Sequence, residues 1–205
     1  MFYRIVLAIV RFLLFLLNGN HHYQNREKLP KDQNYIIVAP HRTWIDPVYL
    51  ALAAQPRQFS FMAKKELFEN PFLSWLIRHL NAFPVDRENP GPSAIKKPVK
   101  ILKDGKLSLI IFPTGTRHSS ELKGGAATIA KLSGVPIIPA VYQGPLTVKD
   151  LLKRKRVSVR FGDPLYVERK TKLNKENLTK IDHQIQSAFD QLDQEIDPNF
   201  HYDYK

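Results

Sequence analysis

The sequence contains no cysteine, and its apolar N-terminal segment has no apolar run longer than six residues. Without cysteine the chain cannot form a disulfide, use a thiolate nucleophile or bind a metal through sulfur, which fits a reducing compartment. A run of six is short for a membrane-spanning helix of about 20 residues. Internal repeats and low-complexity tracts are also missing. With 205 residues, 43% of them hydrophobic, we expect one compact domain with a real core.

Acidic residues are scarce beside basic ones: 19 Asp and Glu face 31 Lys and Arg, for a net charge of +12. Such a charge predicts an anionic partner, which can be nucleic acid, an acidic membrane surface, an acidic carrier protein or a phosphorylated substrate. No zinc-binding spacing, RNP-like aromatic pair or helix-turn-helix signature accompanies it. We therefore favour anionic lipids or a carrier protein as the partner of a basic cluster formed by Lys96, Lys97, Lys100, Lys103 and Lys106.

Residues 1–17 are apolar except for two arginines. Arg4 and Arg11 are seven positions apart, so on a helix they lie within about 20° of each other. The pattern predicts a helix with a narrow polar stripe and a wide apolar face, lying in the membrane interface without spanning it. Arg11 interrupts the apolar region that a signal peptide requires. We expect residues 1–20 to form a membrane-association helix; packing of this helix on the protein core is the alternative.

The remaining chain, residues 21–205, alternates predicted strands with predicted helices and reads as one domain. Its fold class is therefore α/β, with a mostly parallel central sheet flanked by helices. Residues 18–34 are polar and are expected to form a linker or a short hairpin. The predicted strands are residues 35–39, 59–63, 82–85, 107–112, 137–142 and 157–161. The predicted helices are residues 48–54, 71–80, 93–103, 124–132 and 178–196, the last behind an N-cap at Asn174.

The segment from His41 to Asp46 joins a buried strand to a helix. Positions five apart lie about 140° apart on one helix, but across a strand-to-helix turn the two side chains can meet. A carboxylate that holds one imidazole nitrogen leaves the other free to act as a base. His41 would then deprotonate an acceptor hydroxyl directly, with no serine or cysteine nucleophile. Asp46, followed by Pro47, is also predicted to be the helix N-cap, and a plain cap beside an unrelated histidine is the alternative.

Two further groups of residues follow predicted strands, where open α/β sheets place their ligands. The loop after residues 107–112 contains Thr114, Gly115, Thr116 and Arg117. Its glycine permits a tight turn, and its arginine offers a planar fork for phosphate oxygens. Lys64, Lys65 and Arg87 follow two other strands and could surround an anion at the same edge.

These segments, in this order, resemble the motifs of the PlsC family of 1-acylglycerol-3-phosphate acyltransferases. The family has an HxxxxD block, a block ending in arginine, an EGTR-like block and a proline-bearing apolar block. The matching segments here are residues 41–46, 83–87, 114–117 and 135–139. One departure concerns Thr114, which stands where the family usually has glutamate.

The resemblance implies a fatty acyl transfer from a thioester of acyl-carrier protein or coenzyme A to the free hydroxyl of lysophosphatidate, making phosphatidic acid. His41 would be the general base and Asp46 its partner. Arg87, Arg117 and Lys64 or Lys65 would bind the glycerol phosphate in a loop shaped by Gly115. No metal and no tightly bound cofactor is expected. The enzyme would sit on the cytoplasmic side of the cell membrane as a peripheral or monotopic protein, in contact with anionic lipids.

Three alternatives remain open from the sequence. The acceptor could be another lysophospholipid or glycerol 3-phosphate, because no sequence feature decides between acceptors. A basic nucleic-acid-binding protein would explain the charge, and a non-catalytic peripheral membrane protein would explain the N-terminal helix. Neither of the last two gives a reason for the HxxxxD block. Acyl-chain length and oligomeric state are not encoded in any motif we identify.

Overall fold

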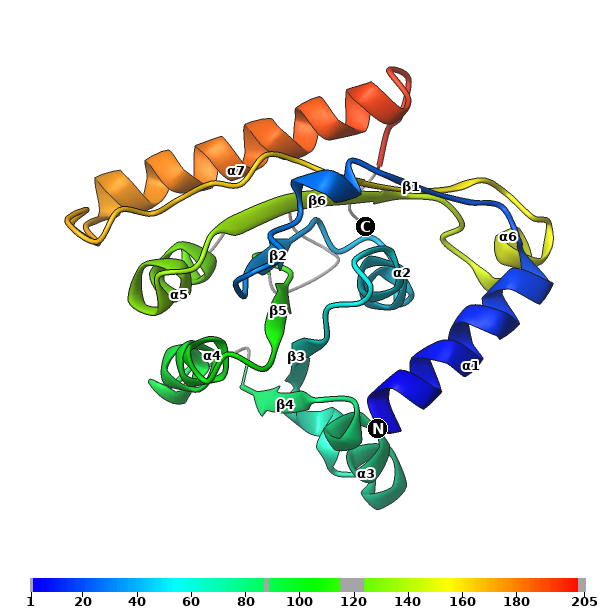
Figure 1. Ribbon diagram of the computed structural model, residues 1–205, viewed down its shortest axis with the longest axis horizontal. Coiled ribbons are helices and arrows are strands. Elements are labelled where there is room, and N and C mark those ends of the chain that lie inside the picture. The colour runs from blue at the N-terminus through cyan, green and yellow to red at the C-terminus, as the bar shows by residue number, and fades with distance from the viewer. Residues whose placement is uncertain (1, 87–88, 115–123, 203–205) are drawn as a thin grey trace.

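The computed structural model describes residues 2–86, 89–114 and 124–202 and has the predicted α/β architecture (Figure 1). Its centre is a seven-stranded sheet with the order β1-β7-β6-β2-β5-β3-β4. The pairing of β6 with β7 is antiparallel and the other neighbouring pairs are parallel. The strands are β1 (His21–Gln24), β2 (Ile36–Val38), β3 (Phe59–Lys64), β4 (Ala82–Val85), β5 (Ser108–Ile111), β6 (Ile137–Gln143) and β7 (Val157–Phe161).

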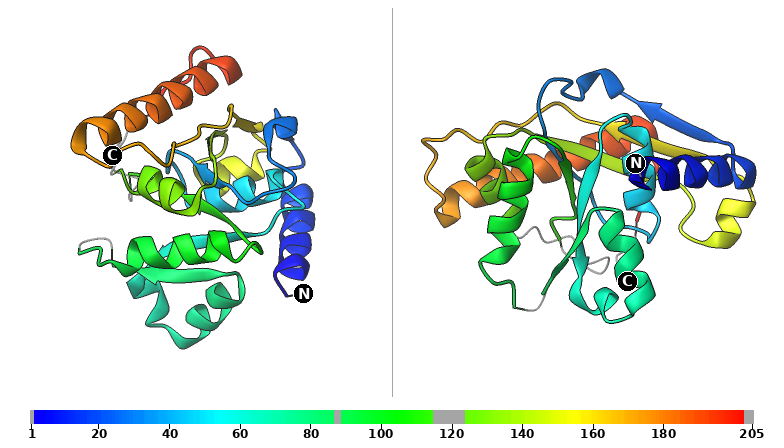
Figure 2. Two further views of the ribbon diagram at one scale, coloured as in Figure 1. Left: turned by 60° about the vertical axis from the view of Figure 1, so that its left-hand side comes forward. Right: turned by 60° about the horizontal axis from the view of Figure 1, so that its bottom comes forward.

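Helices cover both faces of the sheet (Figures 1 and 2). Helices α1 and α2 pack on one face, and α4, α5 and α7 pack on the other. Strand β2 lies between the two cores: Ile37 contributes to one, Ile36 and Val38 to the other, and all three are fully buried. Burial on both faces explains its continuous apolar run. The helices are α1 (Phe2–Leu17), α2 (Asp46–Ala53), α3 (Pro71–His79), α4 (Ser93–Lys103), α5 (Gly125–Ser133), α6 (Val148–Leu152) and α7 (Lys175–Ile196).

Local sequence signals account for several of the helix ends. The Asn174 side chain accepts a hydrogen bond from the Asn177 backbone N–H at 3.0 Å, which confirms the predicted N-cap of α7. Gly134 ends α5 with a φ of 78°, a conformation that glycine adopts without steric cost. Helix α4 continues from Ser93 to Lys103 with Pro98 inside it.

The prediction of a linker or hairpin for residues 18–34 was wrong. Residues His21–Gln24 form β1, which pairs in parallel with β7 at the edge of the sheet. An edge strand pairs on one side only and here has no fully buried residue, so it lacks the apolar run that marks the interior strands. The 3₁₀ helix Arg26–Lys28 follows it.

Helix α1 has two different faces. Tyr3 and Leu14 are buried, and Leu7 and Val10 pack against the same core. The other side exposes large apolar side chains, all at least 41% accessible: Ile5, Ile9, Phe12, Leu13, Phe15, Leu16 and Leu17. The helix therefore packs on the protein, as in the alternative reading, and still presents an apolar surface. None of the helices in the described part of the chain has the length and apolar character that crossing a bilayer needs.

Candidate active site

The candidate site lies where the carboxyl ends of neighbouring parallel strands meet. Strands β2, β5, β3 and β4 are adjacent and run in the same direction. His41 follows β2, Thr114 follows β5, Lys65 follows β3 and Asp86 follows β4. Carboxyl ends of adjacent parallel strands lie at the same edge of a sheet, so these residues share that edge, with β5 between the ends of β2 and β3. The structure thus brings three of the predicted segments to one edge of the sheet.

His41 and Asp46 meet across the turn between β2 and α2, as their spacing predicts. His41 Nδ1 lies 3.1 Å from Asp46 Oδ2. An ionised carboxylate only accepts hydrogen bonds, so the hydrogen sits on Nδ1 and Nε2 keeps its lone pair. Nε2 has no hydrogen-bond partner among the described residues, and the His41 side chain is 13% exposed. This arrangement suits a general base with access to a ligand.

The role of Asp46 in the backbone differs from the predicted N-cap. It is the first residue of α2, and Ile45 is the N-cap residue. The carboxylate turns back toward the preceding loop, where Oδ2 accepts hydrogen bonds from the backbone N–H groups of Arg42 at 2.6 Å and Thr43 at 2.9 Å. Asp46 is fully buried. One carboxylate oxygen therefore closes the whole turn and orients the imidazole as well.

The His41 ring stacks on Phe112, with 4.2 Å between ring centroids and 26° between ring planes. Phe112 directly follows β5, the strand next to β2. The imidazole is therefore held at its edge by Asp46 and on its face by an aromatic ring. No local pattern predicts this contact, because it arises between residues 71 positions apart.

The two predicted lysines lie at the same edge and are exposed. Lys64 is the last residue of β3, 3.6 Å from Glu66. Lys65 Nζ lies 2.6 Å from Asp86 Oδ2, which joins the ends of β3 and β4. Both pairs are accessible to water, so each stabilises the fold by only about 0–1 kcal/mol. Their position at the same edge of the sheet as His41 says more about function.

The loop after β5 is described only in part. Thr114 is buried, with 2% of its surface exposed, and it lies three residues past the end of β5, the strand next to β2. Gly115, Thr116 and Arg117, and likewise Arg87 after β4, lie outside the described residues. Among the residues described, no group of acidic and histidine side chains is arranged to hold a metal ion.

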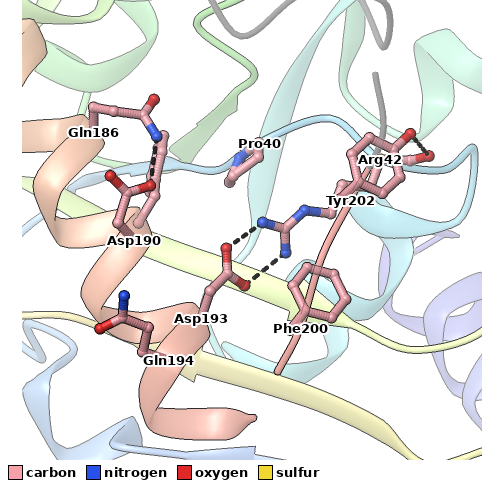
Figure 3. A pocket seen from close by; sticks show the side chains of 9 residues that line it. Pro40, Arg42, Gln186, Asp190, Asp193, Gln194, Phe200 and Tyr202 are labelled. Atoms are coloured by element: carbon pink, nitrogen blue, oxygen red, sulfur yellow. Dashed lines mark hydrogen bonds and ion pairs between the residues drawn. The ribbon is translucent and has the colours of Figure 1, made fainter. Parts of the chain in front are cut away.

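A buried arginine that the sequence analysis did not identify stands directly after His41. The Arg42 guanidinium forms a two-point ion pair with Asp193 of α7 and donates to the Tyr142 carbonyl oxygen at 2.8 Å. It also lies 4.7 Å from the centre of the Phe200 ring. Figure 3 shows these side chains around an open pocket of about 250 Å³. Only the tertiary fold could reveal this contact, since Asp193 lies 151 positions away.

The phenol of Tyr142 stays neutral beside this loop. Burial, and to a lesser degree Tyr49 and the charge of Asp46, raise the pKa of Tyr142 far above its ordinary value. The neutral hydroxyl donates a hydrogen bond to the Pro145 carbonyl oxygen at 2.9 Å. The segment after β6 is thereby held next to the His41 turn, where Thr43 Oγ1 lies 3.3 Å from the Leu146 carbonyl oxygen.

Known proteins match this chain in both sequence and fold. The 1-acyl-sn-glycerol-3-phosphate acyltransferase of Streptococcus pneumoniae strain R6 is 51% identical over 206 residues, covering 100% of this chain and 78% of its own. The enzyme of that name from Bacillus subtilis strain 168 is 39% identical over 188 residues, covering 90% and 94%. A crystal structure of the 1-acyl-sn-glycerophosphate (LPA) acyltransferase PlsC from Thermotoga maritima has a TM-score of 0.72, at 23% identity, over 97% of this chain and 81% of that one. The last match shows that the fold is shared.

The sequence profile of one family, described as Acyltransferase, matches residues 20–143. That span includes His41, Asp46, Lys64, Lys65 and the loop after β5, so it covers the residues at the sheet edge described above. Together with the identity to the two bacterial enzymes, the match identifies the chemistry as O-acyl transfer. The chain belongs to the acyltransferase family.

Proposed function

We propose that this protein acylates the free hydroxyl of 1-acyl-sn-glycerol 3-phosphate and so makes phosphatidic acid. The observation that carries the proposal is the His41–Asp46 pair, with Nδ1 held at 3.1 Å and Nε2 available as a base. The names of the two bacterial relatives support this acceptor. A general base is what the reaction needs, because a neutral hydroxyl is a weak nucleophile toward a thioester.

The reaction is a single acyl transfer from the thioester sulfur to the acceptor oxygen. His41 Nε2 takes the proton of the acceptor hydroxyl as its oxygen attacks the thioester carbonyl carbon. Asp46 stabilises the imidazolium, and its buried carboxylate has Oδ1 without a partner among the described residues. Collapse of the tetrahedral intermediate breaks the carbon–sulfur bond, and the imidazolium returns the proton to the departing thiolate.

The acceptor phosphate is the natural ligand for the basic residues predicted around this edge. Lys64 ends β3 and Lys65 directly follows it, and both are exposed at the same sheet edge as His41. We assign to the same task Arg87, Arg117 and the loop of Thr114, Gly115 and Thr116. The acyl donor would be a thioester of acyl-carrier protein or coenzyme A, acting as a co-substrate, with no tightly bound cofactor and no metal.

We also propose that α1 seats the protein on the cytoplasmic surface of the cell membrane. Its outward side carries seven exposed apolar side chains, and Arg4 and Arg11 lie exposed along its edge. Apolar side chains would enter the acyl boundary while the arginines meet anionic head groups. The acceptor and the product are both lipids, so a surface-seated enzyme can exchange them without extracting them fully into water.

An assay of the purified protein tests the proposal. We expect acylation of lysophosphatidate in anionic vesicles by acyl-carrier-protein or coenzyme A thioesters, and a rate about 10²- to 10⁴-fold lower with His41→Ala. Lysophosphatidylcholine and glycerol 3-phosphate, tried as acceptors, separate the proposal from acylation of another acceptor. Binding to duplex DNA at physiological salt, without acyl transfer, would instead favour the nucleic-acid alternative; vesicle binding without acyl transfer would indicate a non-catalytic membrane protein.

A further inference from the structure

The turn that carries His41 is tied to the C-terminal part of the chain through Arg42. This residue is 7% exposed, and its guanidinium is paired at two points with the Asp193 carboxylate. Two-point pairing of this kind fixes direction as well as distance. Gln143 Nε2 donates to Asp193 Oδ1 and to the Asp193 carbonyl oxygen, both at 2.9 Å, so the carboxylate is itself held in place.

The backbone N–H and the backbone carbonyl of Arg42 both form hydrogen bonds as well. Its N–H donates to Asp46 Oδ2 at 2.6 Å, the oxygen that receives His41 Nδ1–H. Its carbonyl oxygen accepts a hydrogen bond from the Tyr202 hydroxyl at 2.8 Å. Phe200 and Tyr202 place their rings 4.7 and 5.8 Å from the guanidinium carbon (Figure 3). Arg42 therefore contacts α7 and the segment after it through its guanidinium and its carbonyl oxygen. Its backbone N–H binds the carboxylate of Asp46.

We infer that Asp193 and Tyr202 are positioning residues for acyl transfer, which act through Arg42 on the Asp46–His41 pair. The inference rests on the proposed function, because it takes His41 as the base. Neither residue needs to touch a substrate. Their effect is to hold the Arg42 backbone, and with it the N–H that orients Asp46 Oδ2, in one place during the proton transfer.

The geometry favours this role over simple support of the fold. An ion pair that only supported the fold could lie at the surface, whereas the Arg42 side chain is buried. It also donates a further hydrogen bond to the Tyr142 carbonyl oxygen near the end of β6. Asp190, one turn earlier on α7, borders the same pocket, and among the described residues its side chain pairs with Gln186 alone, at 2.8 Å. The chain therefore offers a matched control, a second aspartate on the same helix for which the described structure has no bond to the turn that carries His41.

The test compares Asp193→Asn, Tyr202→Phe and the control Asp190→Asn in the full-length protein with vesicle-borne lysophosphatidate. Misplacing a catalytic group by about 1 Å costs roughly 100-fold; we expect kcat to fall about tenfold or more in Asp193→Asn and a fewfold in Tyr202→Phe. KM for the acceptor should stay within about twofold in both, since the inferred role of each residue is to position the base and not to bind substrate. Asp190→Asn should match the wild type. All assays run well below the measured Tm of each variant.

A double-mutant cycle with Asp46→Asn separates positioning from general support. If Asp193 acts through the Arg42–Asp46 contact, Asp193→Asn should lower single-turnover rates clearly less in the Asp46→Asn background than in the wild type. Equal losses in both backgrounds, or a KM effect without a kcat effect, would overturn the inference. If Asp193→Asn does not fold, Tyr202→Phe decides alone, and unchanged kcat there would refute the role. An active His41→Ala would instead refute the proposed mechanism itself.

Discussion

The exposed side of α1 permits a quantitative test of the membrane seat with one side chain. Phe12 is 61% exposed, which on an aromatic side chain of about 200 Å² corresponds to about 120 Å². Phe12→Ala would remove about 80 Å² of the surface that enters the lipid, worth about 2 kcal/mol at 25 cal/mol per Å². The partition coefficient onto anionic vesicles should therefore fall about 30-fold. The free energy of unfolding should change little, because the side chain faces away from the core.

Two matched variants serve as controls. Leu132 lies on α5 and is 46% exposed, so Leu132→Ala removes comparable apolar surface from a different part of the fold; its vesicle binding should equal that of the wild type. Leu14 is 6% exposed and packs in the core, so Leu14→Ala should lower the free energy of unfolding by about 2–5 kcal/mol without changing the vesicle affinity of the folded protein.

The assay is vesicle co-sedimentation over a lipid titration, with thermal unfolding measured in parallel. Equal binding of Phe12→Ala and wild type would refute the membrane seat. Single substitutions are better here than deletion of the helix, since deletion would also uncover the core residues that Tyr3 and Leu14 cover.

Three further predictions concern the chemistry. His41→Ala should lower the acyl-transfer rate by about 10²- to 10⁴-fold with an unchanged circular dichroism spectrum, and near-normal turnover would exclude His41 as the base. Lys65→Ala should raise KM for lysophosphatidate about tenfold or more, as loss of a charge-assisted hydrogen bond costs about 1.5–3 kcal/mol. Lys170→Ala is its control, because Lys170 is exposed between β7 and α7, in a segment that pairs with the amino end of β6, opposite the site. An equal effect in both would point to general electrostatics. Arg117→Lys should lower kcat/KM for the phosphorylated acceptor by a similar factor, because a point charge does not replace a two-point fork; unchanged kinetics would remove Arg117 from the phosphate site.

Local patterns in the chain were enough for most of the fold. Interior strands such as β2 and β7 are buried on both faces, so they appear as short apolar runs between turn residues. The caps at Asn174 and Gly134 depend on a few neighbouring residues and could be recognised from them. The edge strand β1 was missed because its pairing with β7 depends on residues more than 130 positions away.

The candidate site divides in the same way. His41 and Asp46 lie within six consecutive residues, from the turn after β2 to the first residue of α2, so the sequence by itself determined that they meet. The direction of the Asp46 carboxylate could not be predicted from the sequence. Two sets of backbone N–H groups compete for it, those of Arg42 and Thr43 and those at the start of α2. The stacking of Phe112 on His41 and the pairing of Arg42 with Asp193 join segments far apart in the chain, and only the packing of α7 and β5 around β2 decided them.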